Sequence, residues 1–528
     1  MAKDLEADEA LARTVLLIAN DVFNKVKGED PGLERDILAG LRKTSIRIVA
    51  DDLNLSSHSG QSCVVALAGL TAMMGIRVTL DMPNVRLIHA QPPLRGTHIV
   101  EALKEYASDM VPGAVMGEAD SPDDLVIVIG SSPFHGDSQF TLTGTDWSFE
   151  LSCQPRRTTW TAEIAIGALA GAAAAAAEVF RAALSVISAT SGISLPSQSR
   201  NHIDFNRVVR VNLGHPLLKT DAVDLSIVDV VSAGAITSAA LYCLRRLVSV
   251  RGQFRFFDED TLELSNLNRY MFGRRSDLGQ NKAELLSGYK TPNVEISYVP
   301  RMFSDQCVKE HGPLAPTVLV GVDDIPSRWT VQRAEPLWCC VGATSHLWPV
   351  LVSTHNDGEP CAGCAHPTDS DFAGEIPTIS FVSFWAGILQ VRALLLHAFG
   401  AIPESPQVLV APAGLFGDHG VTRMGLPPNE VCPVQCRASR AMLQADTTKA
   451  TLRNSTLQAR SSQWSLTTHE EDLKWATEVT VIKSMHSLFE LHIQFGTVIG
   501  KSSSGLLKVR SPGNTARHPQ VFHHTSRR

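Results

Sequence analysis

The stretch Phe257–Lys282, FDEDTLELSNLNRYMFGRRSDLGQNK, brings acidic, amide and basic side chains together within a short segment of the chain. It continues the run QFRFF, which is typical of a buried strand, so Asp258 is expected at the carboxyl edge of a sheet. A carboxylate at that edge can accept hydrogen bonds from ribose hydroxyls. Arg269 and Lys282 would neutralise a triphosphate while its α-phosphorus is attacked. The stretch therefore predicts a nucleotide site.

Two further segments support a nucleotide site more weakly. Ser232–Thr237 reads SAGAIT, with Gly234 in the middle, where a nucleotide site normally has a Gly-rich turn whose backbone N–H groups approach phosphates. An ordinary tight turn between strand and helix is the alternative there. VGVDDIPSR ends another predicted strand at Asp323, a carboxylate that can hold Mg²⁺ against phosphates.

Strands and helices alternate in two series along the chain, in the same order each time. The first series is predicted to contain strand Ser45–Asp51, helix Gly60–Gly75, strands Ile76–Pro83 and Asp123–Pro133, a hairpin through Gly144 and an Ala-rich helix from Ile164. The second is predicted to contain strand Asp224–Val231, helix Ala235–Val250, strand QFRFFDED, strands Pro316–Asp324 and WPVLVSTH, and helix Ile376–Phe399. This alternation predicts an α/β fold with a mostly parallel sheet flanked by helices in each half.

Length and composition suggest where the domains end. A chain of 528 residues suggests two or three domains. Ser188–Asp204 is rich in Ser, Gly and Asn and is a natural linker, and beyond Ala441 the sequence becomes polar. We therefore predict domains at 1–190 and 191–440, followed by a partly disordered extension at 441–528.

Charge and hydropathy argue against several classes of protein. The net charge is −7 and the basic residues are scattered, which is not the pattern of a nucleic-acid-binding protein. The acidic, mixed N-terminus is not a signal peptide. The long apolar run from Ile164 is Ala-rich and contains Glu178 and Arg181, which predicts a buried helix rather than a membrane span. We expect a cytoplasmic protein that binds neither nucleic acid nor membrane.

The cysteines include two close pairs, Cys361/Cys364 and Cys432/Cys436. In a reducing compartment such pairs indicate metal binding or thiol chemistry rather than disulfides. Together they could supply the four sulfur ligands of a structural Zn²⁺ site, while unrelated thiols are the alternative. Cys339 and Cys340 lie in a predicted buried strand and are expected in the core.

The stretch quoted first resembles the signature of the ThiF/MoeB/ubiquitin-activating E1 superfamily, in which an acid, an SNLNRQ-like run and a D-x-G-x-x-K run occur at this spacing. VGVDDIPSR is similar to the family's strand-end TDN…R segment, and PCAGC and CPVQC resemble its metal-binding cysteine pairs. The similarity covers about residues 222–438. Two features depart from the family pattern: the GxGxxG turn is reduced to Ser232, Gly234 and Thr237, and Tyr270 replaces the usual Gln.

The resemblance implies roles for individual residues. Asp258 would bind ribose, Asp323 would support Mg²⁺, and the remaining nucleotide-binding positions would be Gly234, Asp260, Asn266, Arg269 and Lys282. The first half resembles a degenerate, inactive copy of the same domain, paired with the active second half as in E1 enzymes. In such pairs an arginine from the partner domain's N-terminal helix reaches the ATP phosphates, and Arg13 is the candidate here.

Ubiquitin-type E1 enzymes pass the activated protein to a cysteine thiolate. In several members of the family that cysteine lies just before the last helix, but the matching segment DSDFAGEIPT contains none and has Ala373 near the expected place. Either the chain stops at the acyl-adenylate or another thiol is used. Cys436, or Cys432, is the alternative nucleophile, and that role would break the zinc tetrad.

The implied function is an ATP- and Mg²⁺-dependent enzyme that adenylates the C-terminal carboxylate of a ubiquitin-like protein, followed by thioester transfer to an E2-like partner. The tandem plan, a pseudo-dimer within one chain that could dimerise further, is similar to the E1 proteins of bacterial ubiquitin-like conjugation operons linked to phage defence (the BilD type). Adenylation of a sulfur-carrier protein is the alternative within the class. A non-catalytic scaffold is the alternative outside it.

Overall fold

The computed structural model describes most of the chain up to residue 445. The described residues are 2–23, 31–117, 123–131, 139–154, 160, 162–195, 208–215, 218, 222–344, 349–369, 378–401, 408–412 and 422–445. They all belong to the first of two units, Met1–Leu457, the second being Gln458–Arg528. Most of the predicted extension at 441–528 therefore lies outside the described residues.

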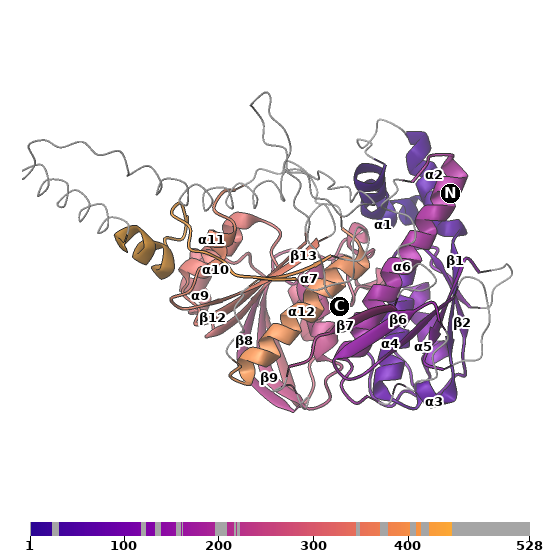
Figure 1. The fold of residues 1–528 in the computed structure, drawn as a ribbon, viewed down its shortest axis with the longest axis horizontal. Helices are drawn as coiled ribbons and strands as arrows, with labels where there is room; N and C mark the ends of the chain where they lie inside the picture. The colour runs from indigo at the N-terminus through magenta and orange to yellow at the C-terminus, as the bar shows by residue number, and fades with distance from the viewer. Residues whose placement is uncertain are drawn as a thin grey trace, which may run out of the picture. The chain divides into compact units, whose positions relative to one another are not determined.

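The strands of the first half form one sheet (Figure 1). Their order in the sheet is β3-β2-β1-β4-β5-β6-β7. The pairings from β3 to β5 are parallel, and β6 and β7 are antiparallel additions. The strands are β1 Ser45–Ala50, β2 Arg77–Asp81, β3 Met116–Gly117, β4 Leu125–Ile129, β5 Gln139–Gly144, β6 Ser148–Ser152 and β7 Val208–Asn212.

The second sheet has the order β10-β9-β8-β11-β12-β13-β14-β15. It is parallel from β10 to β12 and antiparallel from there on. The strands are β8 Val223–Val231, β9 Val250–Phe257, β10 Val294–Val299, β11 Thr317–Val320, β12 Trp338–Thr344, β13 Pro349–Asn356, β14 Val408–Pro412 and β15 Thr422–Met424.

The two sheets correspond strand by strand. Among the parallel strands of each sheet, the first strand of the half (β1 or β8) lies in the middle. The second and third strands lie on one side of it, and the fourth and fifth lie on the other. This is a doubly wound arrangement whose order reverses between β1 and β4 in one sheet and between β8 and β11 in the other. The predicted fold class, two Rossmann-like domains in tandem, is confirmed, and strands β3, β7, β10, β14 and β15 were not predicted.

The helices connect the strands of each half. The longer ones are α1 Ala2–Leu17, α2 Pro31–Lys43, α4 His58–Ala72, α5 Ile99–Ser108, α6 Ile166–Ser191, α7 Ala235–Leu244, α10 Ile325–Arg333 and α12 Ser380–Ala398. The short ones are η1 Ile18–Val22, α3 Asp52–Leu55, η3 Leu264–Asn266, η4 Arg275–Asp277, α8 Lys282–Ser287, α9 Asp305–His311 and α11 Ala362–Ala365.

Helix α7 ends at Leu244, not at Val250 as predicted. Beyond the end of the helix, Nη1 of the Arg246 side chain donates to the carbonyl oxygen of Tyr242. The guanidinium carbon of Arg246 lies 3.2 Å from the centre of the Tyr242 ring. Its Nη2 donates to the carbonyl oxygen of Pro92 in the first half. The chain then turns so that Val250 can begin β9 and pair with Val223. A tertiary contact therefore overrides the local helical pattern.

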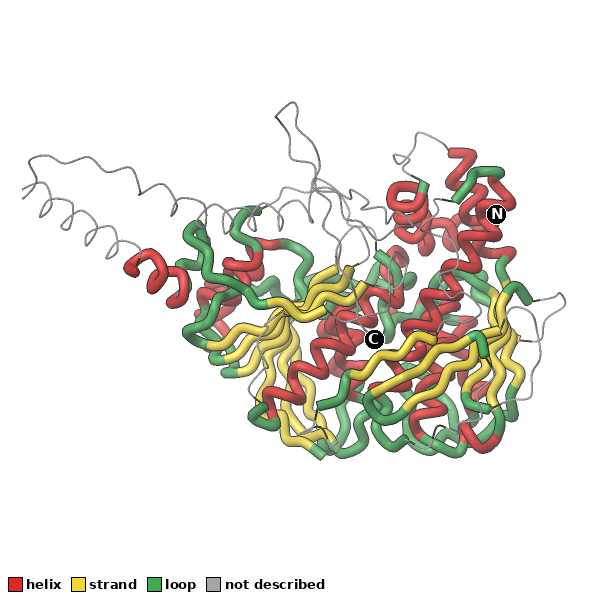
Figure 2. The backbone as a smooth tube through the Cα atoms, viewed as in Figure 1, coloured by secondary structure: helices red, strands yellow, loops and turns green. Residues whose placement is uncertain are grey.

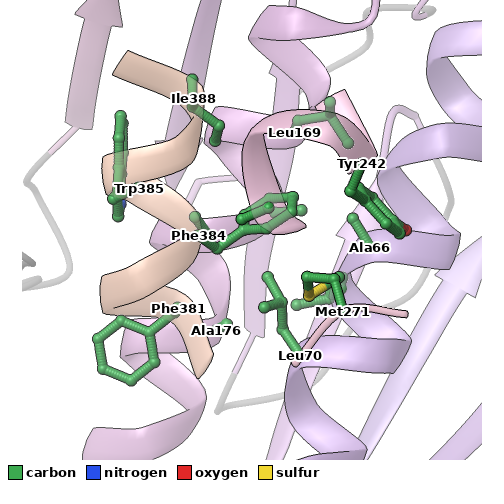
Figure 3. Close-up of a cluster of buried hydrophobic side chains, with 14 of the residues drawn as sticks. Ala66, Leu70, Leu169, Ala176, Tyr242, Met271, Phe381, Phe384, Trp385 and Ile388 are labelled. Carbon is green, nitrogen blue, oxygen red and sulfur yellow. The ribbon is translucent and has the colours of Figure 1, made fainter. Parts of the chain in front are cut away.

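Helices α4, α6, α7 and α12 from both halves lie between the two sheets (Figure 2). Their apolar side chains form the central core, in which Phe384 lies against Tyr242 at a ring separation of 5.4 Å (Figure 3). Gly387 allows α12 to approach α7 closely, because an added Cβ would lie 2.6 Å from the backbone nitrogen of Ala240. The two halves therefore share one hydrophobic core, and each needs the other to bury its helices.

Helices α6 and α12 are long and apolar enough to span a membrane by length and composition, but 83% of each apolar window is buried inside the fold. The predicted assignment of the Ala-rich run as a buried helix is confirmed. Glu178 and Arg181 on α6 form an ion pair with each other within the core. Pairing of this kind is what allows charged groups to be buried.

The connection between the halves differs in detail from the predicted linker at Ser188–Asp204. Helix α6 continues to Ser191, and strand β7, which lies beyond residue 190, pairs with β6 of the first sheet. Just after β7, the carbonyl oxygen of Leu213 accepts a hydrogen bond from Nε of Arg392 on α12 at 2.7 Å. The domain boundaries at 190 and 440 remain predictions.

Candidate active site

A cavity of about 460 Å³ opens at the carboxyl ends of β8, β9, β11 and β12, where the strand order of the second sheet reverses. Open α/β sheets bind ligands at this point. All the residues that were predicted to contact the nucleotide or its phosphates line the cavity: Arg13, Gly234, Asp258, Asp260, Asn266, Arg269, Lys282 and Asp323. The structure thus brings together side chains that are far apart in the sequence, while their roles remain predictions.

Asp258 lies directly after β9 and is 9% exposed. Its Oδ2 accepts the backbone N–H of Ala233 at 2.6 Å, and its Oδ1 accepts that of Asp260 at 2.9 Å. Burial raises the pKa of the Asp258 carboxyl, while the two backbone hydrogen bonds and the charge of Lys282 oppose that rise. The carboxylate therefore ties the end of β9 to the turn before α7, and each oxygen keeps a further lone pair for a ligand hydroxyl.

The turn before α7 differs from a glycine-rich phosphate loop at Ser232. This residue has φ of 81°, a left-handed conformation that glycine adopts without strain. Its hydroxyl oxygen accepts the N–H of Gly234 at 3.0 Å, and its carbonyl oxygen accepts the hydroxyl of Thr237 at 2.7 Å. Gly234, Ala235 and Ile236 still present the N-terminus of α7 to the cavity, where the helix dipole favours an anion.

Arg269 is held against the cavity wall by its neighbours in the SNLNR run. Its Nη1 donates to the carbonyl oxygen of Ser265 at 2.8 Å and to Oδ1 of Asn268 at 2.7 Å. The side chain is 8% exposed and lines the cavity. Asn266 caps its own short helix, because Oδ1 accepts the backbone N–H of Glu263 at 3.2 Å. The guanidinium is therefore fixed in position before any ligand arrives.

Lys282 begins α8, and its Nζ lies 2.9 Å from Oδ2 of Asp260. The Lys282 side chain is 13% exposed and that of Asp260 is 66% exposed, so the pair is weak and a phosphate can replace the carboxylate. Tyr270, at the family's Gln position, is buried and its hydroxyl lies 3.5 Å from the carbonyl oxygen of Lys282. Burial raises the pKa of Tyr270 well above its ordinary value, so its hydroxyl stays neutral.

Arg13 reaches the cavity from α1, which belongs to the first half of the chain. The next residue, Thr14, is fully buried, and its Oγ1 accepts a hydrogen bond from Nδ2 of Asn268 at 3.0 Å. An ion pair between Glu6 and Arg275 at 2.9 Å fastens the same helix farther toward its N-terminus. The first half therefore supplies part of the wall of the second half's cavity.

Asp323 is exposed and lines the cavity just after β11. The loop that carries it is held by Arg328, whose Nη2 donates to the carbonyl oxygens of Val322 at 3.1 Å and Asp323 at 3.4 Å. Nη1 of the same guanidinium lies 3.3 Å from Nε2 of His366. Burial, and then the charge of Arg328, lower the pKa of His366 to about 3, so this nitrogen is a neutral acceptor.

The four predicted zinc ligands meet in one cluster. The sulfur atoms of Cys361 and Cys432 are 3.5 Å apart, those of Cys364 and Cys436 are also 3.5 Å apart, and all four lie within 4.8 Å of one another. Tetrahedral Zn²⁺ with Zn–S bonds of about 2.3 Å needs sulfurs roughly 3.8 Å apart. The donor set and spacing fit a structural zinc site, in which these cysteines would bind as thiolates.

The cluster lies outside the cavity at the carboxyl ends of the strands. Among the described residues, no cysteine lines that cavity, and Cys436 contacts Cys364 and Ser439 instead. The geometry therefore favours a zinc ligand over a thioester nucleophile for Cys436. Ala373 lies outside the described residues. Cys339 and Cys340 are fully buried in β12, as predicted.

The corresponding position in the first half is filled by its own side chains. Asn54, which is fully buried, donates from Nδ2 to Asp51 and accepts the N–H of Trp160 at 2.8 Å. Its amide lies so close to Gly130 that an added Cβ there would be 2.0 Å away. Gly130 follows β4 as Gly321 follows β11. The switch point of the first sheet therefore has no room for a nucleotide phosphate beside Gly130, which agrees with a degenerate first half.

Sequence reasoning missed several residues of the site. Asn268 lies inside the quoted motif but was given no role, and Thr14 gave no signal at all. Other residues that line the cavity without having been singled out are Ala235, Ile236, Glu259, Thr261, Glu263, Gly321, Val322, Ala343, Thr344, Thr378 and Ser383. Thr344 at the end of β12, and Thr378 and Ser383 near the start of α12, are polar residues at the ends of predicted elements, and this position was the signal that could have found them.

Comparison with known sequences identifies the family. Residues 219–491 match the ThiF family, and residues 45–194 match the BilD N-terminal domain. Because the first match spans just over half of the chain, the chain belongs to the ThiF family, a class of ATP-dependent adenylating enzymes. The resemblance predicted from Phe257–Lys282 is confirmed. An uncharacterized protein, y4jF of Sinorhizobium fredii (strain NBRC 101917 / NGR234), is 24% identical over 419 residues, covering 78% of this chain and 75% of y4jF.

Solved structures of E. coli MccB resemble part of the fold. The complex with selenomethionine-labelled MccA is 16% identical, with a TM-score of 0.31, and covers 39% of this chain and 66% of MccB. The complex with ATP is 14% identical, with a TM-score of 0.32 and the same coverage. The chain thus spans about two thirds of the length of MccB. At these TM-scores the similarity carries no argument about function.

Proposed function

We propose that the chain uses ATP and Mg²⁺ to adenylate the C-terminal carboxylate of a ubiquitin-like protein, and that a thiol of an E2-like partner then receives the acyl group. Membership of the ThiF family supports the reaction class. The match of the BilD N-terminal domain supports a two-domain activating enzyme rather than a sulfur-carrier adenylyltransferase. The observation that best supports the proposal is that one cavity is lined by Asp258, Arg269, Lys282 and Asp323.

The side chains around the cavity suit the proposed step. A carboxylate oxygen attacks the α-phosphorus of ATP, the bond from that phosphorus to the bridging oxygen breaks, and pyrophosphate leaves. Arg269 and Lys282 would stabilise the charge on the phosphates, and Asp258 would orient the ribose. Mg²⁺, when bound, neutralises phosphate charge, and Asp323 is the residue placed to hold it. The remaining volume toward Thr344 and Thr378 would take the substrate's C-terminal tail.

Thioester transfer would consume the adenylate. The sulfur of a thiolate attacks the acyl carbon, the bond to the phosphate oxygen breaks, and AMP leaves. Since the segment 369–378 contains no cysteine and Cys436 lies in the cysteine cluster, the partner is the better source of the thiol. A reducible conjugate between this chain and the ubiquitin-like protein that disappears in Cys436→Ala would restore Cys436 as the nucleophile.

ATP–pyrophosphate exchange in the presence of a ubiquitin-like protein tests the adenylation step. Intact protein is expected to exchange label, and Arg269→Ala is expected to lose exchange by about 100-fold or more. Arg251→Ala is the matched control, because Arg251 is an exposed arginine at the opposite, amino-terminal end of β9. Exchange that is unchanged in Arg269→Ala would contradict the assignment.

A non-catalytic scaffold is the second candidate, and one observation favours it. The Ser232 hydroxyl occupies the N–H of Gly234 that a phosphate loop would offer to ATP. Failure of the intact protein to bind ATP at millimolar concentration would support the scaffold. ATP binding without exchange would instead point to a different carboxylate substrate, such as a sulfur-carrier protein.

A further inference from the structure

Asn268 is fully buried between the nucleotide cavity and the first half of the chain. Its Nδ2 donates to Oγ1 of Thr14 at 3.0 Å and to the carbonyl oxygen of Thr378 at 3.2 Å. Its Oδ1 accepts from Nη1 of Arg269 at 2.7 Å. One amide thus joins three segments that are remote in the sequence: α1, the SNLNR run and the residue that leads into α12.

The amide can take only one orientation. A guanidinium only donates, so the atom that faces Arg269 must be the oxygen, and the carbonyl of Thr378 only accepts, so the atom that faces it must be the nitrogen. Both amide hydrogens and the carbonyl oxygen of Asn268 then have partners. Because the site is buried, water cannot replace a lost partner, and each of these bonds constrains the others.

Every segment joined by Asn268 also contributes a side chain to the cavity. Arg13 precedes Thr14 on α1, Arg269 follows Asn268, and Thr378 itself lines the cavity. The Oγ1 of Thr378 lies 3.3 Å from the Oγ of Ser383, another lining residue. A shift at any of the three segments therefore moves a group that lines the cavity.

We propose that Asn268 is a positioning residue, which holds Arg269, Arg13 and Thr378 in their positions around the cavity. Through the contact of Asn268 with Thr14, the first half of the chain thereby tunes the nucleotide site of the second half. The proposal rests on the proposed function only in taking the cavity as the ATP site. It gives the first half a definite part in the reaction although its own site is filled by Asn54. The first half would act through α1 and not through a second nucleotide.

The test uses the full-length chain and compares four variants by the dissociation constant of a fluorescent ATP analogue. Asn268→Ala is expected to weaken binding by about tenfold, and Thr14→Val, which removes only the hydroxyl, by about threefold to tenfold. Thr14→Ser keeps the hydroxyl and is expected to restore binding. Thr44→Val is the matched control, since Thr44 is a fully buried threonine whose hydroxyl bonds within the first half, to Gly40.

A double-mutant cycle separates positioning from a general loss of stability. In an Arg269→Ala background, Asn268→Ala is expected to weaken ATP binding by a smaller factor than in the wild type, because one of the groups that Asn268 positions is gone. Equal losses in both backgrounds, or wild-type ATP affinity in Thr14→Val, would overturn the proposal. Melting temperatures of all variants show whether each is folded. A different result would contradict the proposed function: intact protein that binds ATP but exchanges no pyrophosphate. That result would leave the role of Asn268 in ATP binding untouched.

Discussion

The hydroxyl oxygen of Ser232 accepts the backbone N–H of Gly234 at 3.0 Å, at the turn that leads from β8 into α7. In a glycine-rich phosphate loop that N–H is free to approach a phosphate. Ser232 also has φ of 81°, where a side chain is strained. The turn thus has the shape of a phosphate loop, with one of its donors already occupied.

Replacing this serine is expected to improve nucleotide binding. Ser232→Gly frees one N–H for a phosphate, so ATP affinity should rise about fivefold, equivalent to about 1 kcal/mol. Titration of a fluorescent ATP analogue measures the change. Ser232→Ala is the comparison, because it removes the hydroxyl and keeps the strained backbone. If Ser232→Gly binds no more tightly than the wild type, the hydroxyl does not compete with phosphate.

Loss of the Lys282 charge is expected to impair catalysis. Lys282→Met removes a cation that lines the cavity, and pyrophosphate exchange should fall by about 100-fold to 1,000-fold. Lys290→Met, at an exposed lysine just after α8, is the control. Exchange within threefold of wild type in Lys282→Met would remove Lys282 from the reaction.

The cysteine cluster is expected to hold one zinc ion per chain. Elemental analysis should find zinc in the purified protein, and Cys432→Ser should lower both the zinc content and the melting temperature, the latter by at least about 5 °C. Cys153→Ser changes a cysteine outside the cluster and should affect neither. Full zinc occupancy in Cys432→Ser would exclude that residue as a ligand.

Each chain is expected to bind one ATP. The amide of Asn54 fills the position beside Gly130, so the first half has no space for phosphates there. Calorimetric titration should therefore give a stoichiometry of one, and Asn54→Gly should destabilise the fold without creating a second site. Two equivalent sites per chain in the wild type would show that the first half is not degenerate.

The stability of the chain is expected to depend on pH through Asp21. Burial raises the pKa of its carboxyl from 3.8 to about 7, and within the described residues its Oδ2 has no hydrogen-bond partner. The folded state therefore retains a proton that the unfolded state releases, so this stabilisation is complete below pH 3.8 and is lost as the pH rises through about 7. Asp21→Asn should remove a difference of roughly 2 to 4 kcal/mol between acidic and alkaline conditions.

Thermal unfolding at pH 5.5 and pH 8 measures this effect. Between pH 8 and pH 5.5, the melting temperature of the wild type should rise more than the melting temperature of Asp21→Asn. Asp52→Asn, at an exposed carboxylate on α3, should leave the wild-type dependence unchanged. Identical pH profiles for Asp21→Asn and the wild type would place the titration elsewhere.

Local sequence predicted most strands and helices well, because the periodicity of apolar residues is a property of short segments. The strands β1, β2, β4, β8, β9 and β11 and the hairpin of β5 and β6 were all expected, as was the buried helix α6. Strand β10 was missed although VEISYV alternates apolar and polar residues and directly follows the turn-forming run TPN, so its sequence did carry the signal of a strand. The end of α7 was misplaced because Arg246 bonds to Pro92, a residue that no local window contains.

By itself the sequence determined which side chains are available and in what order, from Asp258 to Asp323, because the chemistry of each motif is local. Tertiary structure decided which of them meet. Thr14 and Asn268 are 254 residues apart, and only the packing of α1 against the second half puts them in contact. Spacing along a chain does not encode such a contact, because it depends on how two sheets bury their shared helices. For the same reason only the fold shows that Asn54 fills the first half's site and that Ser232 adopts a glycine conformation.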